Sequence, residues 1–336
     1  MRRFITWMCL CVLSVTAEAA QVQGLYQVSV TVADQTQESR DEAILAAYNT
    51  MLIRLSGNDS VLDNPALTKD ATSAGALISS LRYERTDNDE LALVVEFMAP
   101  PMQALIRQSG EPLWGDSRPL TQLWLAVSGE QGREVVGPEN LEWQSSVLSA
   151  MQKRGLPVLL PTWDLDDQMA LPVVSLWGLF EEDIAAAAAR YSSDGYLAGR
   201  IAQVRGQWRF TGYTRYGDVQ SNIMLSHEDP QALLDSVAAN VAEQLSARYA
   251  IVAQNQSAEG EIIRVSGVSS FQQYRALLDY CEAQAAITHT EVLGARQDEV
   301  TLRLSLSGDW LQIRDALALD QALVATDDTH VFVWGR

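Results

Sequence analysis

Strand-like and helix-like patterns alternate along this chain, and two short turn-rich segments interrupt the alternation. The first segment is 109–119 (SGEPLWGDSRP) and the second is 253–260 (AQNQSAEG). Polar, turn-forming stretches of this kind usually connect domains, and 336 residues are enough for two or three domains. The sequence therefore predicts an α/β and α+β fold of three small mixed-sheet modules, at residues 20–112, 120–250 and 261–336.

The first module begins with residues 26–32, in which apolar and polar side chains alternate as in a half-buried strand. A helix follows, with Ser39 and Glu42 as its capping box and Gly57 as its stop. The remaining expected elements are a helix at 74–81, strands at 81–85 and 91–98 around a turn at Asp87–Asn88, and a helix at 102–108.

The middle module reads as strand, helix, strand, helix and then a meander of strands. Its first strand, 123–127 (LWLAV), is wholly apolar, which is typical of a strand covered on both faces. The other expected elements are helix 139–154 with Leu141 facing inward, strand 157–160, helix 181–191, strands 195–204, 207–216 and 219–226, and helix 230–249. This order predicts a three-layer α/β sandwich.

The last module has the pattern β-α-β-β-α-β, which is that of a ferredoxin-like α+β domain. A helix capped by Ser269 or Ser270 follows its first strand, and Asp309 caps the second helix. The strands are expected at 261–265, 287–294, 299–306 and 330–334.

Residues 1–19 have the three parts of a secretory signal. Two arginines precede an apolar stretch from Phe4 to Val15, and Ala17-Glu18-Ala19 has the small-x-small pattern of a cleavage site. We therefore expect cleavage after Ala19 and a periplasmic protein, with an uncleaved anchor as the alternative. The apolar stretch is shorter than the roughly 20 residues that a spanning helix needs, so we expect no stable membrane insertion after cleavage.

The chain is strongly acidic, with a formal net charge of −19 that becomes −20 if the leader is removed. A field of this sign repels phosphate backbones, so we expect no nucleic-acid partner. Cys9 and Cys11 would leave with the leader, and Cys281 would remain without an intrachain disulfide partner. We expect Cys281 to be a buried structural thiol, with a reactive thiol as the alternative.

The sequence contains no nucleophile elbow, phosphate loop or dinucleotide fingerprint. Asp164, Asp166 and Asp167 lie in an acidic loop that lacks the glycine and glutamate of a calcium hand, so we expect the loop to cap the next helix. The three histidines are His227, His289 and His330, and no two of them stand at the spacing of metal ligands. The sequence thus predicts no catalytic residue, no metal ligand and no cofactor.

One pair of predicted strands combines arginines with aromatic residues. Alternation places Arg209, Tyr213 and Arg215 on one face and the rings of residues 208 and 210 on the other. Arginine forks match carboxylates, so Arg200, Arg209, Tyr213 and Arg215 form the candidate surface for a ligand or partner. The alternative is an ordinary solvated sheet face.

Several segments of the chain resemble a known family. They are MLIRLSGN, LWLAV, RGLPVLLPTWD, DGYLAGRI, WRFTGYTRYGD, IIRVSGVSSFQQYRALLDYC and LRLSLSGDWLQIRDALALDQAL. With the leader, they resemble the uncharacterised exported family of Gram-negative bacteria called domain of unknown function "twenty sixty-six". The shared motifs are caps, strand cores and turns, so the resemblance implies no particular chemistry.

These observations favour a non-enzymatic periplasmic protein that binds or helps to assemble another envelope protein or cell-wall glycan. The alternative is a periplasmic hydrolase with an unrecognised active site in the middle module. A solute-binding protein would need two similar lobes around a cleft, which the unequal modules do not suggest.

Overall fold

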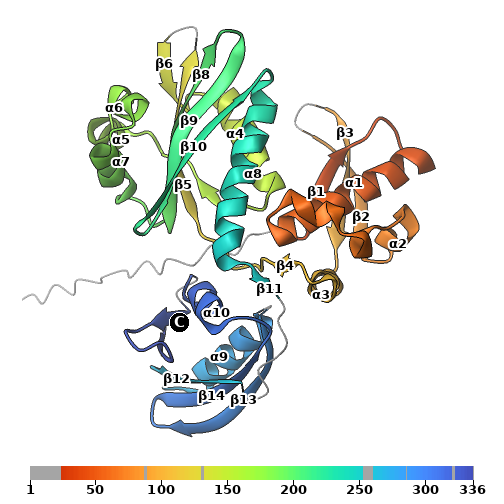
Figure 1. Ribbon diagram of the computed structural model, residues 1–336, viewed down its shortest axis with the longest axis vertical. Helices are drawn as coiled ribbons and strands as arrows, with labels where there is room; N and C mark the ends of the chain where they lie inside the picture. The colour runs from red at the N-terminus through yellow and green to blue at the C-terminus, as the bar shows by residue number, and fades with distance from the viewer. Residues whose placement is uncertain are drawn as a thin grey trace, which may run out of the picture.

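The computed structural model describes residues 24–86, 89–129, 132–252, 260–284, 286–319 and 322–335. Helices and strands in these residues form mixed-sheet modules, which confirms the predicted fold class (Figure 1). No helix in the described part of the chain is both long and apolar enough to cross a bilayer. The predicted leader, the turn at Asp87–Asn88 and nearly all of the segment 253–260 lie outside the described residues.

The first module is a three-stranded antiparallel sheet in the order β1-β3-β2, with a long helix across one face (Figure 1). That helix, α1, buries a stripe that includes Tyr48, Met51 and Leu55 against the sheet. The elements are β1 (Gln27–Thr31), α1 (Gln37–Ser56), η1 (Asp59–Asp63), η2 (Pro65–Leu67), α2 (Ala71–Gly75), β2 (Ile78–Arg85), β3 (Leu91–Phe97) and α3 (Ala99–Ser109).

Two local predictions for this module were wrong. The cap of α1 is Thr36, whose side chain accepts the Ser39 N–H at 3.3 Å, so the helix starts before the predicted capping box. The helix expected at 74–81 ends at Gly75, because Ile78 already pairs with Phe97 in the sheet. Gly57 does end α1 as predicted, with a left-handed φ of 78°.

The middle module has three layers, as predicted (Figure 1). Its six-stranded sheet has the order β10-β9-β8-β5-β6, with β7 beside β5. Helices α4 and α8 cover one face, and α5, α6 and α7 cover the other. The elements are β5 (Thr121–Gly129), β6 (Gly132–Val135), α4 (Leu141–Lys153), β7 (Val158–Leu159), α5 (Leu165–Ala170), α6 (Val173–Gly178), α7 (Glu181–Ala188), β8 (Gly195–Val204), β9 (Gln207–Tyr216), β10 (Val219–His227) and α8 (Pro230–Tyr249).

The strongly patterned elements of this module were predicted well, and the short ones were not. Strand pair β8–β9 turns at Arg205 and Gly206, both with positive φ, as a two-residue hairpin requires. Leu141, expected to face inward, is 70% exposed at the first position of α4. Elements β6, α5 and α6 were missed.

The last module follows the predicted order with one strand added. Its sheet runs β13-β14-β12-β16-β15. The extra strand β15 pairs antiparallel with β16, so β16 runs parallel to β12. The elements are β12 (Glu261–Ser266), α9 (Phe271–Ala283), β13 (Ile287–Arg296), β14 (Glu299–Leu306), α10 (Trp310–Ala318), β15 (Leu323–Ala325) and β16 (Val331–Trp334).

The segment 109–119, expected to be an open linker, is partly buried between the modules. Leu113 packs into the hydrophobic core of the first module, and Trp114 packs into that of the middle module. Strand β4 (Pro112–Leu113) pairs with β11 (Ile251–Val252), whose Ile251 belongs to the core of the last module. The β4–β11 pair therefore joins all three modules.

Two buried arginines fasten the first module to the middle one. Burial lowers the pKa of Arg118 to about 9 and that of Arg54 to about 10, so both stay charged at neutral pH. Their acceptors lie largely at the ends of α1 and α4, where the last carbonyls have no partner within the helix. Arg118 donates to the carbonyls of Arg54, Trp114, Gly115, Arg154 and Gly155, and Arg54 donates to those of Leu25, Gln27, Gln152 and Lys153.

Candidate functional site

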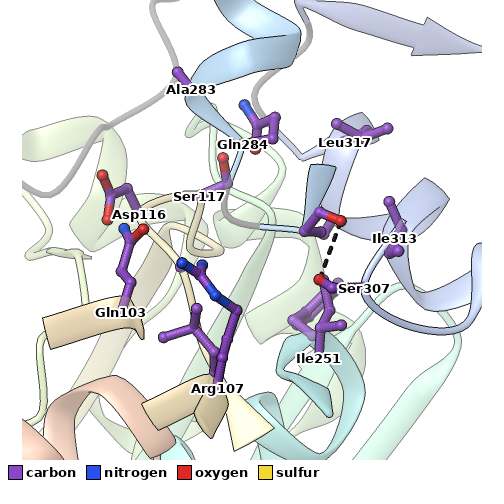
Figure 2. A pocket seen from close by; sticks show the side chains of 15 residues that line it. Gln103, Arg107, Asp116, Ser117, Ile251, Ala283, Gln284, Ser307, Ile313 and Leu317 are labelled. Atoms are coloured by element: carbon purple, nitrogen blue, oxygen red, sulfur yellow. Dashed lines mark hydrogen bonds between the residues drawn. The ribbon is translucent and has the colours of Figure 1, made fainter. Parts of the chain in front are cut away.

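A cleft lies where the three modules meet, and we call it the junction cleft (Figure 2). The first module lines it with α3, and the connecting segment lines it with Leu113 and residues 115–117. The end of α8, strand β11 and the last module, through the end of α9 and through α10, complete the wall. Its free space is about 760 Å³, counting the part open to solvent, which suits a small ligand or a peptide segment.

Asp116 is fixed on one wall of the junction cleft by a chain of hydrogen bonds. The Tyr26 hydroxyl donates to Asp116 Oδ1 at 3.1 Å, and Gln103 Nε2 donates to the Tyr26 hydroxyl at 2.7 Å. Burial, helped by the Asp116 charge, raises the pKa of Tyr26, so its hydroxyl keeps the proton that it donates. Asp116 and Gln103 consequently lie together at this wall (Figure 2).

The last module forms the opposite wall. Ser307 donates both its N–H and its hydroxyl to the Ala286 carbonyl, at 3.0 and 3.2 Å, which ties the end of β14 to the start of β13 (Figure 2). Gln284, just beyond α9, extends into the cleft near Ser117 (Figure 2). Gln284 and Ser117 thus line the cleft from different modules.

The junction cleft combines groups of both polarities with an aliphatic floor. Its polar lining includes a cation, a carboxylate, two amides and a hydroxyl, from Arg107, Asp116, Gln103, Gln284 and Ser117. Its floor is made by Leu113, Ile251, Ile313 and Leu317. Amides, a carboxylate and a cation match the donors and acceptors of a peptide, and the floor accepts an apolar side chain.

Nucleophilic catalysis needs a base within hydrogen-bond reach of the nucleophile. The described residues that line the junction cleft include no histidine. The Ser307 hydroxyl donates to a backbone carbonyl, and Asp116 accepts from Tyr26.

The surface predicted from the sequence is only partly exposed. Tyr213 is 3% exposed and packs with Tyr196 under the helical layer, so its ring offers no stacking surface. Arg200 donates to the Trp177 carbonyl at 2.8 Å and lies against the indole ring of Trp177. Arg209 is exposed and Arg215 is half-buried, and the two bond only weakly to neighbours on β10 and the next turn.

Asp164 caps a helix, but that helix is α5, which the sequence did not predict and which contains Asp166 and Asp167. Asp164 accepts the Asp167 N–H at 2.9 Å and begins α5. Asp167 is fully buried and accepts from Trp163 N–H, the Tyr191 hydroxyl and the Arg190 guanidinium. These contacts hold α5 against the end of α7.

His227 lies on β10, His289 on β13, and His330 in the turn before β16. His227 accepts the Asp229 N–H, and His330 lies 3.0 Å from Glu261 and stacks on Trp310. His289 is exposed on β13. In the part of the chain that the structure describes, no cluster of three His, Cys, Asp or Glu side chains is placed to hold a metal ion.

Sequence reasoning missed the junction cleft because it assigned 109–119 to a linker. A tryptophan, an aspartate and an arginine close together in a supposed linker are the signal that could have found it. Cys281, in contrast, is buried as predicted, and burial raises the pKa of its thiol to about 12.

Comparison with known proteins gives one match. Residues 19–115 match the family described as a domain of unknown function (DUF8605). This range holds the whole first sheet, its helices and the start of the connecting segment, so this part of the chain is similar to an uncharacterised family. No curated protein and no solved structure matches the chain.

Proposed function

We propose that this protein is exported to the periplasm, loses residues 1–19, and binds a segment of another envelope protein in the junction cleft without catalysing a reaction. Its place in an exported Gram-negative family is part of the proposal. The leader pattern supports export, and the strongly negative charge fits a water-soluble envelope protein.

The observation that carries the proposal is the junction cleft itself. The Tyr26 hydroxyl, itself bonded to Gln103, donates to Asp116, and Gln284 lines the same cleft from another module. Clefts between domains are the usual place for ligands. A site assembled from three modules also links binding to their relative position.

A protein segment fits the cleft better than a glycan does. Sugar rings usually stack on exposed aromatic faces, and the aromatic side chain among the described lining residues, Tyr249, is buried. Tyr213, the aromatic residue of the surface expected from the sequence, is buried as well. A peptide would place an apolar side chain on the floor near Ile251 and its amides against Gln103 and Gln284.

Site-specific photo-crosslinking in cells tests the proposal. A benzophenone side chain at Gln284 should give one discrete adduct with an envelope protein, and Asp116→Lys in the same chain should abolish it. The same probe at Met224, which is exposed on β10, is the control. Equal adducts at both positions, or an adduct that survives Asp116→Lys, would refute binding in the cleft.

The location is tested by intact mass of the chain from a periplasmic fraction, which should begin at Ala20. A chain that begins at Met1 and stays with the inner membrane would contradict export with cleavage. A hydrolase would instead release a product from wall or peptide substrates, and loss of that activity in Asp116→Asn would replace the binding proposal.

A further inference from the structure

Strand β1 is an edge of the first sheet, and half of its backbone groups point away from the sheet. Among the described strands β3 is its one partner, and Val32 N–H donates to the Leu91 carbonyl while Phe97 N–H donates to that of Tyr26. In an antiparallel pair, alternate residues face the partner strand. The backbone groups of Gln27, Ser29 and Thr31 therefore face outward.

Two of these three residues keep their outward groups unpaired. Both outward groups of Gln27 are paired, because its carbonyl accepts from Arg54 at 2.7 Å and its N–H donates to the Gly24 carbonyl. Among the described residues, none bonds to the N–H or the carbonyl of Ser29 or Thr31. These four groups have the two-residue repeat that another β-strand needs for pairing.

The other edge of the same sheet is protected and β1 is not. Strand β2 carries Arg82, Glu84 and Arg85 and has a bulge between Ile78 and Ser80. Charges and bulges of this kind block edge-to-edge pairing. Strand β1 reads QVSVT, with no charge, proline or bulge, so it retains the features of a strand that accepts a partner.

Space for a strand lies beside β1. A groove of about 1120 Å³, counting the part open to solvent, runs between β1, Ala46 and Thr50 of α1, and Ser149 and Gln152 of α4. In Figure 1, β1 is the strand of the first sheet nearest the middle module. An added strand would extend the sheet toward α4.

The charged side chains that line the groove are both cationic. Arg54 is 5% exposed and bonded to carbonyls, so Lys153 supplies the exposed positive charge. Lys153 is paired with Asp235 at 2.8 Å but is half exposed, so it can still attract an anion at the groove. Charge complementarity favours a segment that carries a carboxylate.

We propose that β1 binds an extended, acidic segment of a partner protein, which adds a fourth strand to the first sheet. Main-chain hydrogen bonds to Ser29 and Thr31 supply the affinity, as in other cases of strand addition. Side chains on one face of the segment pack on Ala46 and Thr50, and a carboxylate approaches Lys153. This site is separate from the junction cleft and does not depend on it.

Amide hydrogen exchange on the full chain, measured by NMR, tests the proposal with defined probes. The probes are the peptides ETVTVTE and KTVTVTK. ETVTVTE should slow exchange at Ser29 and Thr31 by about tenfold or more and leave Val28 and Val30 unchanged, because those amides already bond to β3. Unchanged exchange at Ser29 and Thr31 with both peptides at millimolar concentration would overturn the proposal.

Two substitutions distinguish backbone hydrogen bonding at β1 from electrostatic attraction by Lys153. Ser29→Pro removes an outward N–H that the sheet does not use and should abolish binding of ETVTVTE. Lys153→Glu should reverse the preference between the two peptides, and equal binding by this variant would contradict the charge argument. If Ser29→Pro does not fold, the exchange pattern of the unsubstituted chain decides alone.

The same experiment distinguishes a second copy of this chain as the occupant. In that case Ser29 and Thr31 would be protected without peptide, in proportion to protein concentration, and sedimentation would show a dimer. That result would overturn the proposal of a separate partner. Failure at β1 with a normal Gln284 crosslink would leave the junction cleft proposal standing.

Discussion

Thr121 and Gln122 are neighbours in β5 whose side chains are both buried, yet they differ in how their polar groups are satisfied. The Thr121 hydroxyl lies 2.6 Å from that of Tyr216. The Gln122 amide is 0% exposed, and neither its nitrogen nor its oxygen has a partner among the described residues. An unpaired buried amide destabilises the fold, whereas a paired hydroxyl stabilises it.

We predict that Gln122→Met raises the free energy of unfolding by about 1 kcal/mol, because the substitution removes the unpaired amide and keeps the volume. The matched substitution Thr121→Val should lower it by about 1 kcal/mol, since Tyr216 loses its partner. Urea denaturation followed by tryptophan fluorescence measures both. A loss of stability in Gln122→Met would mean that the amide is satisfied by ordered water.

Cys281 shows a residue whose environment the sequence predicted. Its helical spacing from Leu277 and Leu278 indicated a buried position, and the thiol is 0% exposed. Burial raises its pKa to about 12, so the thiol is protonated at neutral pH and a poor nucleophile. Hydrophobic periodicity alone was enough here because the position depends on a single helix face.

We predict that a maleimide labels Cys281 only when the chain unfolds. Peptide mapping by mass spectrometry should find this cysteine unmodified in buffer and modified in high urea. Met224→Cys, at an exposed position on β10, is the control and should react at once. Fast labelling of Cys281 in the native chain would show that the last module opens locally.

At the scale of elements, length decided what the sequence could predict. Helix α8 was predicted with its bounds, and the β8–β9 hairpin with its turn, because each repeats its pattern over many residues. Elements β6, α5 and α6 span four to six residues each and have no measurable period. Such short elements form through contacts with the rest of the fold, as β6 does by pairing with β5.

Asp164 and α5 give a prediction that depends on pH. The hydrogen bond from Asp167 N–H, with help from Arg190, lowers the pKa of Asp164. A carboxyl group with a lowered pKa in the folded chain stabilises the fold at pH values above its pKa in the unfolded chain. This contribution is lost as the pH falls through the pKa of the folded chain. Asp164→Asn keeps the cap without the charge, and Asp164→Ala removes both.

We therefore expect Asp164→Ala to lower the melting temperature by a few degrees at neutral pH, and Asp164→Asn by less. The difference between wild type and Asp164→Asn should shrink as pH falls below about 4, the usual pKa of an aspartate, because the wild-type carboxylate then becomes protonated. Thermal melts across this range measure it. A constant difference would mean that the ionised carboxylate adds nothing to the cap.

At the scale of the whole molecule, the composition of one segment led to a wrong prediction. The segment 109–119 has the residues of a linker, but Trp114 and Arg118 are buried in it. The carbonyls at the ends of α1 and α4 require hydrogen-bond donors, and Arg118 supplies them. The local sequence around Arg118 gives no sign of these distant acceptors. A cleft built from several distant segments is likewise invisible until the modules are placed together.

We predict that Arg118→Met weakens the junction of the first two modules. Five carbonyl oxygens lose a charged donor, and the free energy of unfolding should fall by about 3 kcal/mol or more. Brief chymotrypsin treatment should cut this variant beside Trp114, which is fully buried in the wild type and should resist. Arg209→Met, at an exposed arginine, should behave like the wild type. If the wild type is cut as fast as Arg118→Met, the modules move independently. The junction cleft would then lack the fixed wall that holds Asp116.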